Sequence, residues 1–296
     1  MQTILKTENL TKRYGSKIAV NKVNITIEKG DIYGFIGKNG AGKTTTMRLL
    51  LGMSFADEGN IELFGSKDLN RARHRVGALI EAPGLYKNCT AYENMKRFSI
   101  LYGGNDQDIR EILSLVGLEN TGKKKAGDFS LGMRQRLGIG LAMLGNPDLL
   151  ILDEPINGLD PEGIKEIRDS IIRLNEEKGV SFMISSHLLD ELGKIVTKYG
   201  IIRDGCLVEE ISSEELHRRC TDGIRIRTTD IDKSAAFLTS ILSQSSIQKH
   251  EDYILVSDDT VSAAVLNQKL VMAGHLVNEI TMQIGSLENY FIERIG

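Results

Sequence analysis

Hydrophobic and polar positions alternate near the start of the chain in the way that β-strands require. Within residues 18–27, every second residue from Val23 to Ile27 is apolar, and this period of two predicts a half-buried strand. Residues 3–10 form a second strand-like run, and the polar residues 11–16 between the two predict a turn. We therefore expect an antiparallel β part at the start of the chain.

Farther along, short apolar strands alternate with helical periods. Residues 32–36 form a continuous apolar run typical of a buried parallel strand, and Ile164, Ile167 and Ile171 recur at the spacing of one helix face. This alternation predicts an α/β architecture with a largely parallel sheet. Helical periods alone run from residue 90 to residue 144, and we interpret about residues 83–145 as a helical insertion. The other expected strands are 61–64, 76–80, 149–152 and 180–185, and the expected helices are 43–52, 91–102, 106–116, 131–144 and 162–175.

The composition of the chain changes near residue 220. Strands are expected after it at residues 224–228, 253–256 and 275–282, and helices at 233–242 and 261–273. This order predicts a small α+β unit of the β-α-β(β)-α-β type, compatible with a ferredoxin-like arrangement. The turn Thr221-Asp222-Gly223 marks the boundary, so we expect one domain over residues 1–220 and a second over 221–296.

The composition fits an ordinary globular protein without a membrane span. The chain has 296 residues, of which 41% are hydrophobic and 26% charged, and no apolar stretch reaches the ~18 residues of a transmembrane helix. The formal net charge of 37 − 40 = −3 disfavours a strongly basic nucleic-acid binder. Cys89, Cys206 and Cys220 form no C-x-x-C pair, so we expect neither a disulfide framework nor a zinc site, and we expect a cytosolic protein.

A glycine-rich segment directly after the apolar run 32–36 carries the strongest chemical signal. Residues 37–44, GKNGAGKT, match G-x-x-x-x-G-K-[ST] at every fixed position, between an expected strand and an expected helix. The backbone N–H groups of such a P-loop and the N-terminus of the following helix bind phosphate. Lys43 would reach the β- and γ-phosphates of ATP, and Thr44 would hold Mg²⁺. The residues that we assign to nucleotide binding here are Gly37, Asn39, Gly40, Ala41, Gly42, Lys43, Thr44 and Thr45.

Two carboxylates directly follow the apolar run 149–152. Asp153 is placed to bind Mg²⁺, either directly or through water. Glu154 is placed to activate the attacking water as a general base. Because successive side chains of a strand point to opposite faces, the two carboxylates can have different roles.

The P-loop and the acidic strand end lie 153 − 43 = 110 residues apart with a helical insertion between them, and this arrangement resembles an ABC-type ATPase subunit. Residues 129–136, FSLGMRQR, are similar to the signature of that family, L-S-G-G-Q. Ser130 and Gly132 match the signature, whereas Leu131 and Met133 depart from its Gly and Gln. The resemblance implies that Ser130 and Gly132 contact ATP bound to a partner ATPase, again through a helix N-terminus.

Further segments strengthen this resemblance, which covers about residues 2–220. Residues 157–160, NGLD, resemble the D-loop of the family, and Ser185-Ser186-His187 resembles its switch histidine. The resemblance implies that His187 contacts the γ-phosphate of ATP on the same chain. Tyr14 stands where the family has an aromatic residue that stacks on adenine.

One departure from the family pattern concerns the end of the expected strand 76–80. Glu81 follows it, where most members of the family carry Gln. Glu at this place resembles the branch that exports antimicrobial peptides, the bacitracin-resistance and lantibiotic-immunity transporters. We assign Glu81 to the metal together with Thr44 and Asp153. The alternative is that Glu81 is a neutral variant in an ordinary drug or export transporter.

The resemblance implies an enzyme that hydrolyses ATP with Mg²⁺ to power a separate membrane permease, with a peptide antibiotic as the expected cargo. One P-loop per chain implies a dimer, formed with a second copy or with a paralogous ATPase subunit. We expect it on the cytoplasmic face of the cell membrane, held there by the permease.

Two other functions remain open at this point. The first is a soluble ABC-type ATPase that acts on nucleic acid or ribosomes, which the negative charge and the lack of sustained heptads disfavour. The second is a regulatory module that binds ATP without hydrolysing it. The presence of Lys43, Asp153, Glu154 and His187 disfavours that reading.

Overall fold

A computed structural model describes residues 2–187, 189–220, 223–243, 246–258, 260–283 and 287–295. It divides into two compact units, Met1–Ser213 with Phe291–Gly296, and Glu214–Tyr290. The division falls after Ser213 rather than after residue 220, and the expected boundary residues Thr221 and Asp222 lie outside the described residues. The chain returns to the first unit at Phe291, whose buried ring packs on Tyr199 with centroids 5.6 Å apart.

A six-stranded sheet forms the centre of the first unit. Its strand order is β10-β9-β4-β8-β7-β6, with β10 antiparallel to β9 and all other neighbours parallel. The predicted α/β core with a largely parallel sheet is therefore confirmed. Strands β4, β7 and β8 are buried over their whole length, as apolar runs covered on both faces should be. In spatial order the strands are Cys206–Ser212, Lys198–Arg203, Ile32–Ile36, Ser181–Ser186, Leu149–Asp153 and Val76–Leu79.

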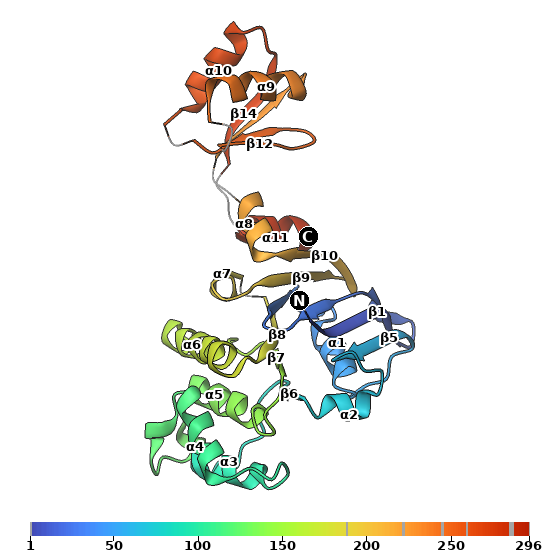
Figure 1. Ribbon diagram of the computed structural model, residues 1–296, viewed down its shortest axis with the longest axis vertical. Coiled ribbons are helices and arrows are strands. Elements are labelled where there is room, and N and C mark those ends of the chain that lie inside the picture. The colour runs from blue at the N-terminus through green and yellow to red at the C-terminus, as the bar shows by residue number, and fades with distance from the viewer. Residues whose placement is uncertain are drawn as a thin grey trace. The chain divides into compact units, whose positions relative to one another are not determined.

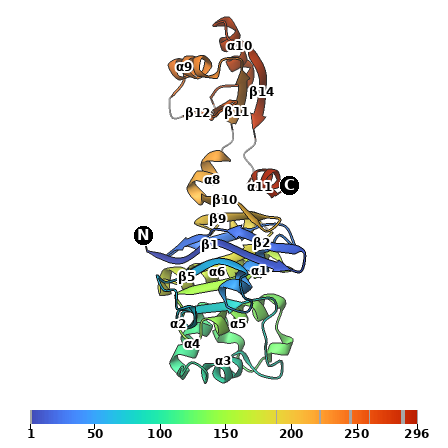
Figure 2. The same cartoon turned by 90° about the vertical axis from the view of Figure 1, so that its right-hand side faces the viewer.

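A second sheet is antiparallel and is built from β1 (Thr3–Tyr14), β2 (Lys17–Val23), β3 (Thr26–Glu28) and β5 (Glu58–Leu63). In Figure 2 this sheet, with β1, β2 and β5 labelled, faces the viewer. The turn predicted over residues 11–16 is wrong at its start. Strand β1 continues to Tyr14 because Thr11 is fully buried, and its hydroxyl accepts a hydrogen bond from the Lys22 N–H at 3.1 Å. The strand predicted over residues 18–27 is two strands, because the Thr7 hydroxyl takes up backbone hydrogen bonds at the break.

Helices cover both faces of the six-stranded sheet. In Figure 1, α6 lies on one side, and α1 lies on the other, between this sheet and the antiparallel one. The sequence sets the helix starts: Asp160 caps α6 ahead of Pro161, and Thr90 with Glu93 forms a capping box at α3. Among the described helices, none combines the length and apolar character that crossing a bilayer requires. The helices of this unit are α1 (Lys43–Leu50), α2 (Leu69–Arg73), α3 (Ala91–Ser99), α4 (Asp106–Leu115), α5 (Leu131–Ala142), α6 (Pro161–Lys178) and α7 (Leu189–Leu192), with 3₁₀ turns at Glu119–Thr121 and Ala126–Asp128.

The second unit is a small α+β fold with its own apolar core. Its strands form one antiparallel sheet in the order β12-β13-β11-β14, and the elements follow one another as β-α-β-β-α-β. Ile226, Leu238, Ile254 and Leu266 are fully buried in its core. Its elements are α8 (Ser213–Arg219), β11 (Gly223–Thr228), α9 (Ile231–Ile241), β12 (Ile247–Lys249), β13 (Ile254–Val256), α10 (Ala263–Met272) and β14 (Val277–Gln283), after which α11 (Leu287–Ile295) leads back to the first unit.

The second unit should lose stability on acidification because of His250. Its ring stacks on Tyr253 at 4.2 Å, and burial, with Arg219 and Arg225 nearby, lowers the pKa of His250 below its ordinary 6.5 despite the opposing charge of Asp252. The unfolded state then binds the proton more readily than the folded state. Stability is therefore expected to fall as the pH drops through and below 6.5, and to be independent of this group at higher pH.

Hydrogen exchange of the β13 amides between about pH 7.5 and about pH 5.5 measures this effect. Replacing His250→Asn should reduce the pH dependence of their protection, whereas the control His74→Asn, at an exposed position of the first unit, should not. An equal pH dependence in the unmodified chain and in His250→Asn would contradict the expectation.

Candidate active site

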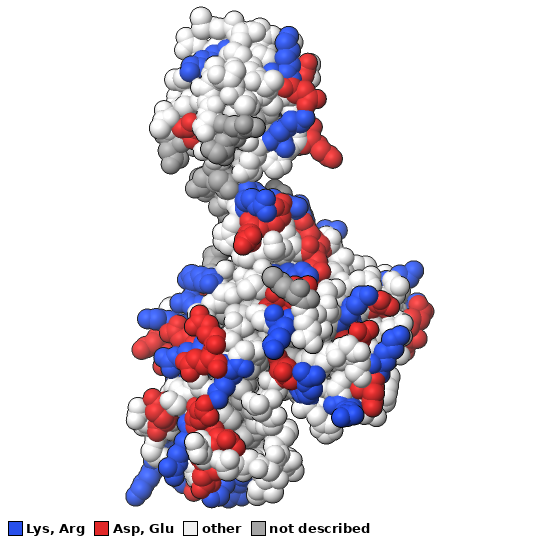
Figure 3. Space-filling view, viewed as in Figure 1, with Lys and Arg blue, Asp and Glu red and all other residues white. Residues whose placement is uncertain are grey.

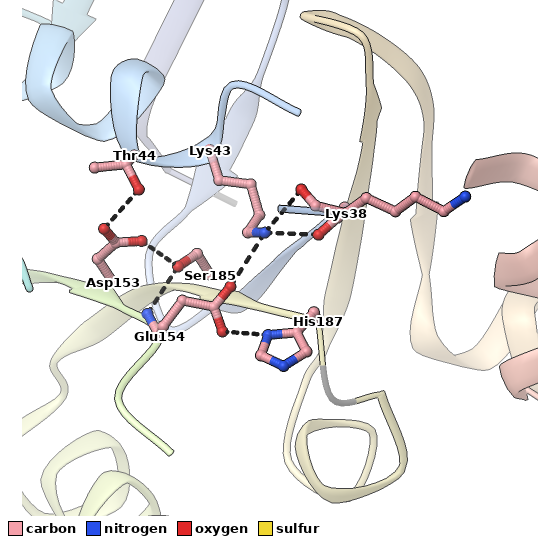
Figure 4. Close-up of polar contacts among 8 residues, drawn as sticks. Lys38, Lys43, Thr44, Asp153, Glu154, Ser185 and His187 are labelled. Carbon is pink, nitrogen blue, oxygen red and sulfur yellow. Dashed lines mark hydrogen bonds and ion pairs between the residues drawn. The ribbon is translucent and has the colours of Figure 1, made fainter. Parts of the chain in front are cut away.

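The predicted chemical residues meet at one edge of the six-stranded sheet. Strands β4, β8 and β7 are neighbours and parallel, so their carboxyl ends lie together. The P-loop follows β4, His187 follows β8, and Asp153 with Glu154 ends β7. Figure 4 shows that these side chains point toward one another from three segments far apart in the sequence.

The P-loop conformation depends on glycine at two positions. Gly42 has φ +108°, and a Cβ there would lie 2.5 Å from the Ala19 carbonyl oxygen. A Cβ on Gly37 would lie 2.5 Å from the Ile202 carbonyl oxygen. The loop can therefore curl tightly into α1, whose first residue is Lys43.

Lys43 is a buried cation at the centre of the site. Its Nζ donates to the carbonyl oxygens of Gly37 at 2.6 Å and Lys38 at 3.3 Å, and lies 3.1 Å from Glu154 Oε1 (Figure 4). Only 5% of the side chain is exposed. Burying an ammonium group is costly unless it is paired, so the loop carbonyls and the carboxylate keep this charge inside the site.

Thr44 and Asp153 present oxygen atoms side by side. The Thr44 hydroxyl donates to Asp153 Oδ2 at 2.7 Å, and the Ser185 hydroxyl donates to Asp153 Oδ1 at 2.6 Å. A hydroxyl and a carboxylate oxygen are hard ligands of the kind that Mg²⁺ prefers, with water completing its shell. Thr44 and Asp153 therefore fit the expected Mg²⁺, to which they would supply two ligands.

Glu154 links Lys43 to His187. Its Oε2 lies 2.8 Å from His187 Nδ1, and among the described residues no hydrogen bond reaches its Oε1, which has only the ion-pair contact with Lys43. Its backbone has φ +49°, a conformation that costs a non-glycine residue about 1–3 kcal/mol. This bend turns the side chain from the strand direction into the site.

Glu81, the third residue assigned to the metal, forms an ion pair with a side chain of α1. Its carboxylate forms an ion pair with the guanidinium of Arg48, and its side chain is 67% exposed. Arg48 lies one helical turn beyond Thr44 on α1, and its positive charge attracts the carboxylate. The structure thus brings Thr44 and Asp153 together and pairs Glu81 with Arg48, and the assignment of Glu81 to the metal stays a prediction.

A pocket of about 300 Å³ lies over the P-loop. Tyr14, which is 52% exposed, belongs to its wall together with residues of the P-loop and Glu154. The pocket has the size and position for a nucleotide whose phosphates rest on the loop. Its lining residues are Tyr14, Lys17, Ala19, Asn39, Gly40, Gly42, Lys43, Thr44, Thr45 and Glu154.

Ser130 and Gly132 lie at the N-terminus of α5 and do not line this pocket. Ser130 caps the helix by accepting a hydrogen bond from the Met133 N–H at 3.2 Å, and it is exposed. Gly132 is buried. The N-terminus of α5 is thus open to a ligand from outside the chain, and its dipole favours an anion.

Ser185 and Arg48 are contacts of the site that the sequence analysis did not assign. Ser185 directly follows the apolar strand residues 182–184, and a polar residue at that place in a buried strand is a signal that could have identified it. Arg48 had no such signal, because its pairing with Glu81 joins residues from two separate elements.

Comparison with known proteins finds relatives along the whole chain. The sequence profile described as ABC transporter matches residues 20–157. The chain is 44% identical over 301 residues to the bacitracin transport ATP-binding protein BcrA of Bacillus licheniformis, covering 100% of this chain and 98% of that protein. It is also 44% identical over 207 residues to the lantibiotic transport ATP-binding protein SrtF of Streptococcus pyogenes, covering 70% of this chain and 90% of SrtF.

The fold also matches solved structures of ATP-binding cassettes. The ADP conformation of MJ1267, an ATP-binding cassette of an ABC transporter, superposes with a TM-score of 0.67 at 27% identity. The match covers 73% of this chain and 93% of that one. A nucleotide-free ATP-binding cassette from an ABC transporter gives a TM-score of 0.65 at 26% identity, over 73% of this chain and 94% of the other.

Proposed function

Because the chain belongs to the ATP-binding subunits of ABC transporters, we propose that it powers the export of a peptide antibiotic, of the bacitracin or lantibiotic type, through a separate membrane permease. As a member of this family it is an ATPase that binds and hydrolyses ATP for transport. The observation that carries the proposed cargo is the 44% identity over the whole chain to a bacitracin transport ATP-binding protein.

The alternative of an ATPase acting on nucleic acid has no comparable support. On the face of the molecule seen in Figure 3, Lys and Arg are interspersed with Asp and Glu. A nucleic-acid surface instead requires basic residues gathered into a patch or stripe.

We assign the residues of the pocket to the parts of ATP. Lys43 is assigned to the β- and γ-phosphates, because its ammonium group is held inside the P-loop by the carbonyl oxygens of Gly37 and Lys38. Thr44 and Asp153 hold Mg²⁺, which when bound supplies positive charge to the phosphate oxygens. Tyr14 offers an exposed ring at the pocket wall for stacking on adenine.

Glu154 is the residue that we assign as the general base. Its Oε1 keeps acceptor capacity among the described residues, as a carboxylate that takes a proton from water must. His187 Nδ1 lies 2.8 Å from the other oxygen, Oε2, and the His187 side chain is one-third exposed. His187 therefore orients the base through Nδ1, and its other ring nitrogen is the group that we assign to the γ-phosphate, to which it can donate only when it carries a proton.

The site requires a second ATPase subunit to be complete. Ser130 lies at the exposed N-terminus of α5, outside the pocket of its own chain. We propose that it meets the γ-phosphate of ATP on a partner subunit, either a second copy or a paralogue, where the helix dipole adds favourable potential. ATP binding would close this dimer, and hydrolysis would reopen it.

A groove of about 480 Å³ between β6, α3 and α5 is the surface that we assign to the permease. Its lining is largely apolar and includes the ring of Tyr102, which is 56% exposed. We place the ATPase on the cytoplasmic face of the membrane, where the permease would insert an apolar segment into this groove. The residues that line the groove are Arg73, His74, Val76, Gly77, Ala78, Leu79, Pro83, Gly84, Phe98, Tyr102, Gly138, Leu141, Ala142, Leu144 and Pro147.

A complementation experiment tests both the cargo and this surface. Cells that lack the chain should become more sensitive to bacitracin, and the unmodified chain should restore their tolerance. Tyr102→Glu should fail to restore tolerance and should no longer copurify with a multispan membrane protein, because a charge in an apolar contact is costly. The matched control Leu101→Glu, at an exposed position outside the groove, should restore both.

Two results would count against the proposal. Unchanged tolerance of the deletion strain to bacitracin and to lantibiotics would reject the cargo. Copurification of ribosomal or DNA-bound proteins in place of a membrane protein would reject the permease.

A further inference from the structure

A single hydroxyl joins the two acids of the site. The Ser185 Oγ donates its proton to Asp153 Oδ1 at 2.6 Å and accepts the Glu154 backbone N–H at 2.8 Å. Both bonds run between neighbouring parallel strands, because Asp153 and Ser185 are partners in the register of β7 and β8. Ser185 is fully buried, so water does not compete for these bonds.

The direction of the two hydrogen bonds is set by their partners. A backbone N–H can only donate, so the serine oxygen must accept from Glu154. The one hydroxyl proton is then directed to the carboxylate of Asp153, which is only 6% exposed. A charge-assisted hydrogen bond of this kind is stronger than a neutral one.

The bond to Asp153 decides which carboxylate oxygen remains for a metal. Oδ1 is occupied by Ser185, and Oδ2 is turned to the Thr44 hydroxyl at 2.7 Å. The bond to Glu154 acts on the base, because it holds the N–H of a residue with the left-handed φ of +49°. That backbone conformation aims the Glu154 carboxylate at Lys43 and His187.

We propose that Ser185 is a positioning residue of the ATPase reaction, which orients the metal-binding oxygen of Asp153 and the general base Glu154 through one hydroxyl group. The inference rests on the proposed roles of these two acids. In this role Ser185 acts through the two acids and does not itself need to touch the nucleotide or the metal. Its removal should therefore weaken metal binding and loosen the Glu154 backbone together.

Three variants separate positioning from simple strand packing. Ser185→Ala removes the hydroxyl, and Ser185→Thr keeps it. Ser181→Ala is the matched control, since Ser181 is also fully buried in β8 and its hydroxyl also accepts a backbone N–H, from Gly30 at 2.9 Å, but it touches neither acid. Thermal unfolding of each variant confirms that it is folded.

The first measurement is the affinity of the ADP-loaded chain for Mn²⁺, followed by electron paramagnetic resonance without turnover. Ser185→Ala should weaken Mn²⁺ binding by about 10–100-fold, the range known for lost partners of metal ligands. Ser185→Thr should stay within about threefold of the unmodified chain, as should Ser181→Ala.

The second measurement is hydrogen exchange at the Glu154 amide in the chain without nucleotide or metal. Ser185→Ala should accelerate this exchange by at least about tenfold, and Ser185→Thr should restore the protection. Unchanged Mn²⁺ affinity in Ser185→Ala, or an equal loss in Ser181→Ala, would overturn the inference. If the unmodified chain bound no Mn²⁺ with ADP, the proposed metal site itself would fail, and the positioning role with it.

Discussion

Glu154→Gln is expected to lower the rate of ATP hydrolysis by roughly 10²–10⁴-fold while ATP binding persists. The amide retains the size of the side chain but cannot take a proton from water. The hydrogen bond with His187 and the contact with Lys43 both involve Glu154, so the substitution also removes the negative charge between two donors. Bound ATP, whose phosphates supply negative charge there, should then hold the closed dimer together.

Steady-state phosphate release and size-exclusion chromatography with ATP measure the two effects. The control is Glu162→Gln, an exposed acid in the first turn of α6, which should hydrolyse ATP at the parental rate. A Glu154→Gln variant that turned over at the parental rate would remove this residue from the role of base.

Lys43→Ala is expected to weaken ATP binding by about 10–100-fold, the equivalent of one or two charge-assisted hydrogen bonds lost from a buried site. The effect should be large because only 5% of the lysine side chain is exposed, so water can replace it poorly. The substitution also leaves Glu154 without its cation. That carboxylate would then repel the phosphates more strongly.

Calorimetric titration with ATP and Mg²⁺ measures this affinity. Lys38→Ala is the matched control, because Lys38 contributes its backbone carbonyl to the site while its side chain points away (Figure 4). Unchanged nucleotide affinity in Lys43→Ala would refute the P-loop assignment.

Local chemistry explains which features were predictable from the sequence. The P-loop, the acidic strand end and the capped helices each depend on residues close together in the chain, such as Thr90 and Glu93 at the start of α3. The signals that set them are therefore visible in one short window. The buried strands β4, β7 and β8 were predictable for the same reason, since continuous apolar runs mark them.

The features that the sequence analysis missed depend on tertiary contacts. Thr11 was predicted in a turn because it is polar, yet its hydroxyl is satisfied by the backbone of β2 and the strand continues. Strands β9 and β10 were not anticipated, and pairing on the edge of the sheet stabilises them. The contact between Glu81 and Arg48 was not anticipated either, because the two residues belong to separate elements.

The first unit is formed by two separate stretches of the chain, and this affects how the protein folds during its synthesis. The face of Tyr199 is covered by Phe291, which leaves the ribosome only after all of Glu214–Tyr290 has been made. At cellular rates of synthesis this delay amounts to several seconds. The nucleotide pocket can therefore form while translation continues. The packing of Phe291 on Tyr199 forms only after the smaller unit has been synthesised, so that unit has time to fold before the first unit is complete.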